Sequence, residues 1–453
     1  MQKTMNGQQA RADAVVVGGG LAGLVAAAEL AGAGLKTLLL EKSGHAGGRA
    51  ITQEQAGGYL FNLGPHALYR KGAAQKILRE LGVKWTGALP PTKGGRVIYR
   101  GRKFIAPLGT LPLLTTGLLS LSEKIETARL LSSLDSIDAD ALDTVSLRDW
   151  LESSIKSERV RQLLTTIVRV TSYTYDPERM SAGAALKQVW LGLAGNVDYL
   201  DGGWQTLVDS ALGVARAAGA EVLTNASVLS IKREANEYRL HLRSGETYTA
   251  SAVVLAASPQ AALSMMEGGE ETILRKWADE ALPVKAACLD VALKRLPNPR
   301  SLFALGIDRP LYCIVHSATA RLAPEGGALI HVMKNHSTGE DTDPKADRKE
   351  LEETLDLMQP GWRDCVAHAR FLPGITVSNA VVTARQGGLK GRPRPVVPGF
   401  DNLYVAGDWV GPEGMLLDAS VSSAHHAAQL ILKRRNEAAL DAASQSQHER
   451  LIA

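Results

Sequence analysis

Three glycines near the start of the chain have the spacing that a bound nucleotide diphosphate requires of a protein backbone. Gly18, Gly20 and Gly23 form a G-x-G-x-x-G pattern directly after the apolar residues 14–17. The first glycine permits a tight turn, the second lets a pyrophosphate approach the backbone, and the third lets a helix pack closely on a sheet. This pattern therefore predicts the binding of a dinucleotide.

The elements expected around these glycines agree with that chemistry. An alanine-rich helix is predicted over residues 24–33, and its N-terminus would present free N–H groups to the diphosphate. A second strand, residues 38–40, ends at Glu41, whose carboxylate can accept both hydroxyls of an adenosine ribose. An acid there disfavours the 2′-phosphate of NADP, so NAD and FAD both fit. The predicted site also includes the flanking residues Leu21, Ala22 and Lys42.

Two further segments carry groups suited to a diphosphate and a polyol. Gly48 and Arg49 combine a backbone that a ligand can approach with a fixed positive charge. A predicted strand near the other end of the chain stops at Gly407 and Asp408, and an alanine- and serine-rich helix follows over residues 417–433. A carboxylate at a strand end can bond a polyol chain, while the helix N-terminus faces the rest of the ligand.

Together these motifs resemble the FAD-binding motifs of the flavoprotein superfamily of amine oxidases, protoporphyrinogen oxidases and phytoene desaturases. Residues 61–66, 199–204, 387–393 and 407–420 resemble the phytoene-dehydrogenase-like branch most closely. The resemblance implies an α/β plus α+β fold, in which a Rossmann-type FAD-binding domain is interleaved with a substrate domain made of a mixed sheet and a helical cap. It implies FAD as the cofactor, with Gly407 and Asp408 on its ribityl and diphosphate. Further implied FAD contacts are Gly64, Pro65, His66, Val228, Met415 and Leu416.

The predicted domains alternate along the chain. The FAD-binding domain is assigned residues 13–85, 201–259 and 386–435, the substrate domain residues 86–200 and 260–385, and a polar, frayed tail residues 436–453. Strands near residues 285–293, 311–316 and 328–334 are expected to form a sheet beneath the flavin.

His66 is the candidate catalytic residue, because the turn before it passes near the flavin in related proteins and an imidazole titrates near neutral pH. The alternative is a structural histidine that bonds the local backbone. His316 is a second candidate, although a histidine on a strand is more commonly part of the core. Arg169, Tyr173 and Tyr175 are weaker candidates that would line the cavity from the cap.

The departures from the amine-oxidase pattern concern the flavin face. The segment between Gly411 and Ala419 has no aromatic residue, and Leu416 stands where amine oxidases place one. Cys288, rather than Lys285, stands nearest to the position of a lysine found in many such oxidases. An aliphatic face favours an apolar substrate, isoprenoids included. The expected function is therefore an FAD-dependent desaturase, dehydrogenase or isomerase that forms or moves a carbon–carbon double bond.

Two other functions remain open. The first is a flavin oxidase of an amine or a tetrapyrrole precursor, which would release hydrogen peroxide. The second is a non-catalytic scaffold that carries flavin or lipid. The sequence does not choose the electron acceptor, which for an enzyme would be oxygen, a quinone or another oxidant.

The composition is that of a large enzyme rather than a nucleic-acid-binding protein. Hydrophobic residues make up 45% of the 453, and the net charge of +4 comes without the clustered basic face that nucleic acid would need. The three cysteines Cys288, Cys313 and Cys365 are far apart, so neither disulfides nor a metal site are expected. Residues 1–12 are polar and lack the apolar core of a signal peptide, which favours a cytoplasmic protein.

Residues 104–121 form an apolar segment without any charge, interrupted by proline and glycine. These breaks argue against a membrane-spanning helix. A buried connector is one interpretation. The other is an apolar surface that gives the protein a peripheral contact with a membrane.

Overall fold

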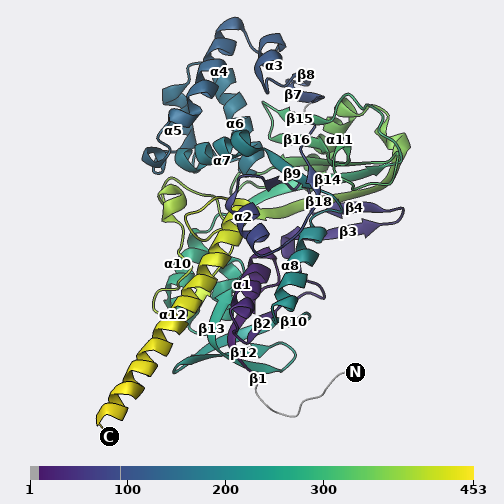
Figure 1. Cartoon of the computed structure of the whole chain (residues 1–453). Helices are drawn as coiled ribbons and strands as arrows, with labels where there is room; N and C mark the ends of the chain where they lie inside the picture. The colour runs from purple at the N-terminus through teal and green to yellow at the C-terminus, as the bar shows by residue number, and fades with distance from the viewer. Residues whose placement is uncertain (1–9, 92, 453) are drawn as a thin grey trace.

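The computed structural model describes residues 10–91 and 93–452, and the side chains of residues 11–91 and 93–441. In it, the glycine motif lies at the carboxyl edge of a seven-stranded sheet (Figure 1). Its strands are β1 (Ala10–Val17), β2 (Thr37–Leu40), β10 (Glu221–Leu223), β11 (Val228–Glu234), β12 (Glu237–Leu242), β13 (Thr247–Leu255) and β19 (Leu403–Val405). They have the order β10-β2-β1-β13-β12-β11, and β19 pairs with the end of β13. β13 is one continuous strand whose first half pairs with β12 and whose second half pairs with β19.

The parallel centre of this sheet brings the predicted nucleotide site to one edge. β1 pairs in parallel with both β2 and β13, which places Val17 between Leu40 and Leu255. Gly18 and Glu41 follow at the carboxyl ends of their strands, the edge at which ligands of open α/β sheets bind.

Residues 14–17 of β1 are all apolar because helices pack on both faces of the sheet at this strand. Ala14 and Val16 pack into a core formed with α1 (Leu21–Gly32), α8 (Gln205–Ala217) and α12 (Leu416–Ile452). Val15 and Val17 point to the opposite core, which includes residues of α9 (Pro259–Met265) and α10 (Ile273–Glu280).

A second seven-stranded sheet lies beside the first (Figure 1). In spatial order its strands are β18 (Val366–Ser378), β14 (Val284–Leu293), β17 (Ala328–Asn335), β16 (Leu311–Val315), β15 (Phe303–Gly306), β7 (Gly95–Tyr99) and β8 (Arg102–Ile105). Helix α11 (Pro344–Met358) packs with one face of it. The helices at the far end are α3 (Thr110–Thr115), α4 (Leu121–Ser133), α5 (Leu147–Ser154), α6 (Glu158–Ser172) and α7 (Ala182–Gly195).

Short elements connect the two sheets. They are the hairpin β3 (Thr52–Gln55) and β4 (Tyr59–Asn62), the small sheet of β5 (Leu68–Tyr69), β6 (Gly87–Ala88) and β9 (Val197–Leu200), and helix α2 (Ala73–Glu80). The predicted fold class is confirmed, while the residue ranges of the two domains stay a prediction.

The C-terminal segment differs from its prediction. Residues 436–452 are not a frayed tail but continue α12, which projects beyond the rest of the molecule (Figure 1). This stretch is rich in alanine, glutamate and glutamine and contains neither glycine nor proline, so its helix propensity carries the helix past the core. Within the described residues, no helix is long and apolar enough to cross a lipid bilayer. The predicted polar N-terminus falls largely on residues 1–9, outside the described residues.

Candidate functional site

A cavity of about 600 Å³ lies at the carboxyl edge of the first sheet and reaches the second sheet. Its size is in the range of pockets that hold cofactors and other small molecules. Most of the predicted cofactor-binding residues line it: Gly18, Gly20, Leu21, Ala22, Glu41, Lys42, Gly48, Arg49, Pro65, His66, Val228, Gly407, Asp408 and Leu416. The chain therefore brings together residues that lie up to almost 400 positions apart in the sequence.

Three predicted residues lie outside this lining and have packing roles. Gly23 faces the turn of the glycine motif, where a Cβ atom would lie 1.9 Å from the carbonyl oxygen of Gly18. Gly64 packs on Cys288, and Met415 belongs to the core of the helical cap. Gly23 therefore has the close-packing role that the motif predicts, while the predicted cofactor contacts of Gly64 and Met415 stay predictions.

The glycine motif fits a dinucleotide at Gly20. A Cβ atom built on Gly20 would meet no atom within 4 Å, so the missing side chain leaves room on the cavity side. Gly20 is also the N-cap of α1 and supplies no side-chain bond to it, so the first N–H groups of this helix are free for an anion. Gly18 serves the turn itself, with φ of 111° and Ala256 O only 2.4 Å from where a Cβ would be.

Glu41 is fixed in place by the backbone. Its Oε2 accepts a 2.6 Å hydrogen bond from Gly19 N, and its Oε1 accepts one of 2.8 Å from Ser43 N. Each carboxylate oxygen keeps a further lone pair. The acid can therefore still accept the ribose hydroxyls that the sequence predicts for it.

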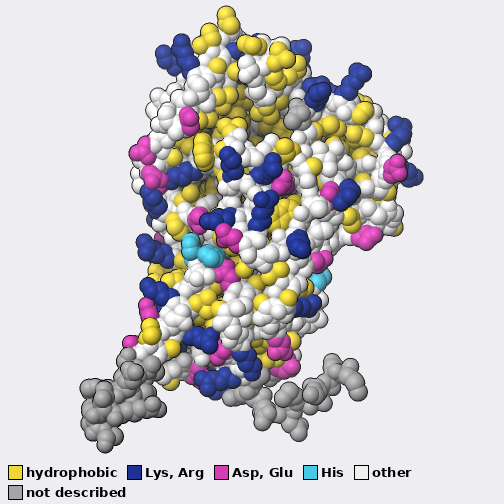
Figure 2. All heavy atoms as spheres, in the orientation of Figure 1, with side chains coloured by type: hydrophobic (Ala, Val, Ile, Leu, Met, Phe, Trp, Pro, Cys, Tyr) yellow, Lys and Arg dark blue, Asp and Glu magenta, His cyan; other side chains and the backbone are white. Residues whose placement is uncertain are grey.

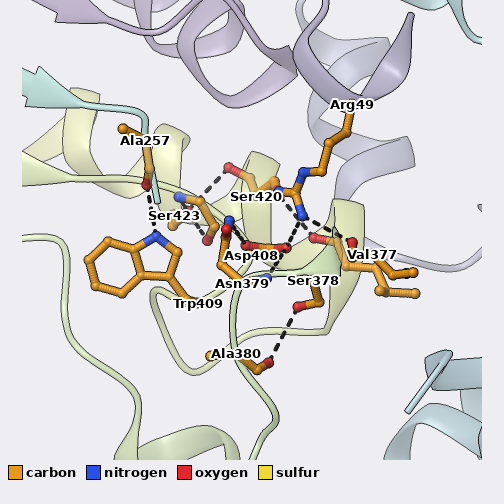
Figure 3. A network of polar contacts seen from close by, with 12 residues as sticks. Arg49, Ala257, Val377, Ser378, Asn379, Ala380, Asp408, Trp409, Ser420 and Ser423 are labelled. Carbon is orange, nitrogen blue, oxygen red and sulfur yellow. Dashed lines mark hydrogen bonds and ion pairs between the residues drawn. The ribbon is translucent and has the colours of Figure 1, made fainter. Parts of the chain in front are cut away.

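Asp408 is the centre of a polar network that joins segments far apart in the chain (Figure 3). Arg49 donates to its Oδ2 at 2.7 Å, and Asn379 donates to both oxygens, from its side chain at 2.8 Å and from its backbone at 3.1 Å. Burial acts to raise the pKa of Asp408, but the charge and hydrogen bond of Arg49 and the bonds from Asn379 outweigh it and lower the pKa. Asp408 is therefore ionised and held by protein groups.

Sequence reasoning missed two residues around Asp408. Asn379 lies just after β18 and nothing in its local sequence marks it. Arg392 is buried and donates to the backbone oxygens of Asp408 at 3.0 Å and of Gly414 at 2.7 Å. A basic residue in the motif at residues 387–393 was a signal that could have identified it as an anchor of this loop.

His66 lines the cavity, but both of its ring nitrogens face backbone carbonyls. Nδ1 lies 3.0 Å from Gly64 O and Nε2 3.1 Å from Arg49 O, and the ring packs 4.8 Å from that of Trp204. Burial lowers the pKa of His66 below its ordinary value. This geometry favours the structural alternative, in which His66 joins two turns at the cavity wall; its part in catalysis stays a prediction.

The other sequence candidates divide between cavity and core. Tyr173 lines the cavity, whereas His316 is buried outside its lining, with its ring 4.2 Å from that of Tyr199. Burial lowers the pKa of His316 well below its ordinary value. Arg169 donates to Gly306 O at 2.5 Å and so joins α6 to the second sheet, with Tyr175 against it.

A buried row of polar residues beside the cavity was missed altogether. Asp290 on β14 stands opposite His331 on β17 and Arg370 on β18. His331 Nδ1 lies 2.6 Å from Asp290 Oδ1, Arg370 donates to Asp290 Oδ2 at 2.5 Å, and Cys288 donates to Oδ1 at 3.0 Å. An acid within the otherwise apolar run of residues 286–293 was the available signal.

This row bears on the question of a metal. Cys288, Asp290 and His331 bring three metal-ligating atoms within 4.8 Å of one another. Both oxygens of Asp290 are already hydrogen-bonded, and the charge of Arg370 beside it opposes a cation. The geometry is that of a hydrogen-bonded cluster, and the absence of a metal stays a prediction.

Asp418, which the sequence did not mark, joins α12 to α2. Its Oδ1 accepts a 2.8 Å hydrogen bond from Ala74 N, and its Oδ2 is buried without a partner. A Cβ on Gly72 would lie 2.1 Å from Asp418 Oδ1, which explains the glycine there. Burial raises the pKa of Asp418 to about 6.

Asp418→Asn is expected to remove a pH-dependent loss of stability. A carboxyl whose pKa rises on folding from about 3.9 destabilises the fold as the pH rises through both values, here between about 4 and 6. Asparagine keeps an acceptor for Ala74, so the variant should gain about 2–3 kcal/mol over the parent at pH 8 and little at pH 4. Urea unfolding at the two pH values measures this. Asp418→Ala, which loses the cap, should be less stable than Asp418→Asn at both; equal pH dependence in all three proteins would contradict the prediction.

Comparison with known proteins identifies the family. Residues 21–280 match the family model described as flavin containing amine oxidoreductase. The chain is 32% identical over 242 residues to the putative flavin-containing monoamine oxidase AofH of Mycobacterium tuberculosis, covering 49% of this chain and 51% of AofH. It is 34% identical over 123 residues to coproporphyrinogen III oxidase of Propionibacterium freudenreichii, covering 24% and 23% of the two chains. The first of these matches thus spans about half the length of the relative.

The fold has the same relatives. A solved structure of a putrescine oxidase variant superimposes with a TM-score of 0.74 at 19% identity, over 94% of this chain and 100% of the other. The predicted superfamily is confirmed, while the phytoene-dehydrogenase-like branch stays a prediction. Because the family model covers more than half of the chain, this protein belongs to the flavin containing amine oxidoreductases, and this family implies FAD as the cofactor.

Proposed function

We propose that this protein acts on a neutral, largely apolar substrate, either dehydrogenating it to form a carbon–carbon double bond or moving an existing double bond by isomerisation. The main observation in support is how the carboxylate oxygens in the cavity lining are hydrogen-bonded and buried. These carboxylates belong to Glu41, Asp408 and Asp418. The oxygens of Glu41 and Asp408 are bonded to protein N–H groups, and Asp418 has one oxygen on Ala74 and the other closed off from solvent. The free lone pairs of Glu41 are placed for the ribose, Asp408 is already paired with Arg49, and the unpartnered oxygen of Asp418 is closed off from solvent, so we expect none of the three to pair with a substrate ammonium.

The wall of the cavity next to the second sheet supports an apolar substrate. It includes the side chains of Tyr173, Met333, Ile375 and Leu416. The hydroxyl of Tyr69, another lining residue, is engaged as a donor to Thr171 O at 2.6 Å. Bound FAD supplies the acceptance of a hydride, so the protein has only to hold the reacting carbon in a dry, oriented position. His66 would keep the turn at residues 64–66 fixed against Arg49 for this purpose.

A second candidate function is an oxidase of an amine or a tetrapyrrole precursor that passes its electrons to oxygen. The names of two relatives, a monoamine oxidase and a coproporphyrinogen III oxidase, support it. The presence of aromatic side chains in the cavity lining, which the expected aliphatic face does not include, also supports it. Tyr69, Tyr173 and Trp204 all line the cavity, although none of them lies in the segment before α12 that lacks aromatic residues. These rings can pack on an amine or on a flat macrocycle.

Anaerobic reduction of the bound flavin distinguishes these functions. The purified holoprotein is mixed in turn with apolar polyenes, with amines and with porphyrinogens, and the visible flavin bands are followed. We expect the bands to bleach with a polyene and to return on addition of a quinone or of oxygen. Bleaching only with an amine or a porphyrinogen, with peroxide released in air, would establish the second candidate. Flavin that no such compound reduces would favour the non-catalytic scaffold.

A further inference from the structure

Six aliphatic side chains are exposed together at the end of the molecule that carries α3 and α4. This apolar patch consists of Ile105, Leu108, Leu111, Leu114, Leu121 and Ile125. Leu111 is 70% exposed and Leu121 is 75% exposed, values unusual for side chains of this type in a folded protein. Figure 2 shows hydrophobic side chains gathered at this end with lysine and arginine beside them. Contiguous apolar surface of this kind marks an interaction site.

Other side chains of the same chain segment are buried and hold the patch in place. Leu113, Leu118 and Leu119 of the same stretch are buried in the core beneath it. Thr116 donates to Ile105 O at 2.8 Å, and Lys124 on α4 donates to Leu114 O at 2.7 Å. The apolar segment is therefore both a buried connector and a surface, because some of its side chains are buried in the core and others are exposed.

The chain segment that carries the patch is basic, although Asp308, from the segment after β15, accepts a hydrogen bond from Arg100 N at 2.9 Å. From residue 81 to residue 122 the sequence contains no acidic residue and six basic ones, Lys84, Lys93, Arg96, Arg100, Arg102 and Lys103. The nearest acids on α4 are engaged by other groups of the protein: Glu123 accepts from Ser157 Oγ at 2.9 Å and Glu126 accepts from Lys156 N at 2.7 Å. Arg100, Arg102 and Lys103 are exposed on the hairpin of β7 and β8 next to Ile105.

We propose that the apolar patch docks this protein on the surface of an anionic lipid bilayer. Exposed leucines with adjoining basic side chains are the combination that partitions into a bilayer interface, the leucines by burial and the cations by attraction to anionic headgroups. A second copy of the chain is a poorer occupant, since a two-fold contact would press this basic rim against itself. The proposal is independent of the substrate, because no patch residue lines the cavity among the described residues.

Co-sedimentation with vesicles tests the proposal. The full-length holoprotein is mixed with vesicles of phosphatidylcholine alone and with vesicles that also contain phosphatidylglycerol, and the bound fraction is measured against lipid concentration. We expect binding to the anionic vesicles. The double variant Leu111→Ser/Leu114→Ser should bind them about 100-fold more weakly. Arg100→Gln/Arg102→Gln should lose about fivefold per charge on anionic vesicles and nothing on neutral ones.

Leu229→Ser is the matched control, because Leu229 is an exposed leucine on β11 of the other sheet. It should bind like the parent, and a retained flavin spectrum and melting temperature show that all variants are folded. Absence of binding to anionic vesicles, or equal binding by Leu111→Ser/Leu114→Ser, would overturn the proposal. So would a dimer in light scattering that the same double variant abolishes, since the occupant would then be a second copy.

Discussion

Gly20→Val is expected to abolish FAD binding while the protein keeps its fold. The position has φ of −72°, a value that valine adopts readily, and a Cβ there meets no protein atom within 4 Å. The branched side chain would instead occupy the space in front of the α1 N-terminus, where the diphosphate has to approach the free N–H groups. We expect affinity for FAD to fall at least about 1000-fold, equivalent to about 4 kcal/mol. Fluorescence titration of the apoprotein with FAD measures it.

Two other glycines control this experiment. Gly213→Val adds the same side chain at an exposed glycine of α8 that also has open space around it, and it should bind FAD like the parent. Gly23→Val should instead destabilise the fold, because its Cβ would collide with Gly18 O. Circular dichroism separates loss of fold from loss of binding. A Gly20→Val protein that retains stoichiometric FAD would refute the placement of the diphosphate at this helix.

The parts of the site that the sequence predicts are those defined by local backbone chemistry. The spacing of Gly18, Gly20 and Gly23 specifies a strand, a turn and a helix within a few residues, and Glu41 follows at the end of the next strand. Such turns require particular residues whatever the rest of the chain does. The same holds for Gly407, which follows β19 with φ of 152°.

The parts that the sequence does not predict depend on strand register and on contacts between distant segments. Asn379 reaches Asp408 only because β18 ends beside the loop after β19. Tyr69 and Trp204 line the cavity through packing that no local pattern encodes, which is why an aliphatic flavin face was an incomplete expectation. Asp418 caps α2 from 344 residues away.

The row of His331, Asp290 and Arg370 shows the same limitation most clearly. Period-two alternation places Asp290 on the face of β14 that also carries Cys288 and Ala292. That alternation cannot say which residues of the neighbouring strands stand opposite. Only the registers of β17 and β18 reveal that a buried acid has a histidine on one side and an arginine on the other.

Asp290→Ala is therefore expected to cause a large loss of stability. Asp290 is fully buried, and its removal leaves the mostly buried guanidinium of Arg370 without its carboxylate partner. Removing one partner of a buried ion pair typically lowers the free energy of unfolding by about 3–5 kcal/mol. Asp401→Ala, which breaks the exposed pair with Arg233, should lower it by less than about 1 kcal/mol. Denaturant unfolding of the two holoproteins under identical conditions provides the comparison.

The double variant Asp290→Ala/Arg370→Met separates the loss of the ion pair from the presence of an unpaired charge. Because it removes the guanidinium as well, it should be more stable than Asp290→Ala alone. The pH dependence gives a second readout. Burial acts to raise the pKa of Asp290, but the charges and hydrogen bonds of His331 and Arg370 outweigh it and lower the pKa. The parent should therefore lose this stabilisation as the pH falls below about 4, toward the lowered pKa, and both variants should lack that part of the acid response. Equal stability of the single and double variants would mean that packing at residue 290, rather than the unpaired charge, accounts for the loss.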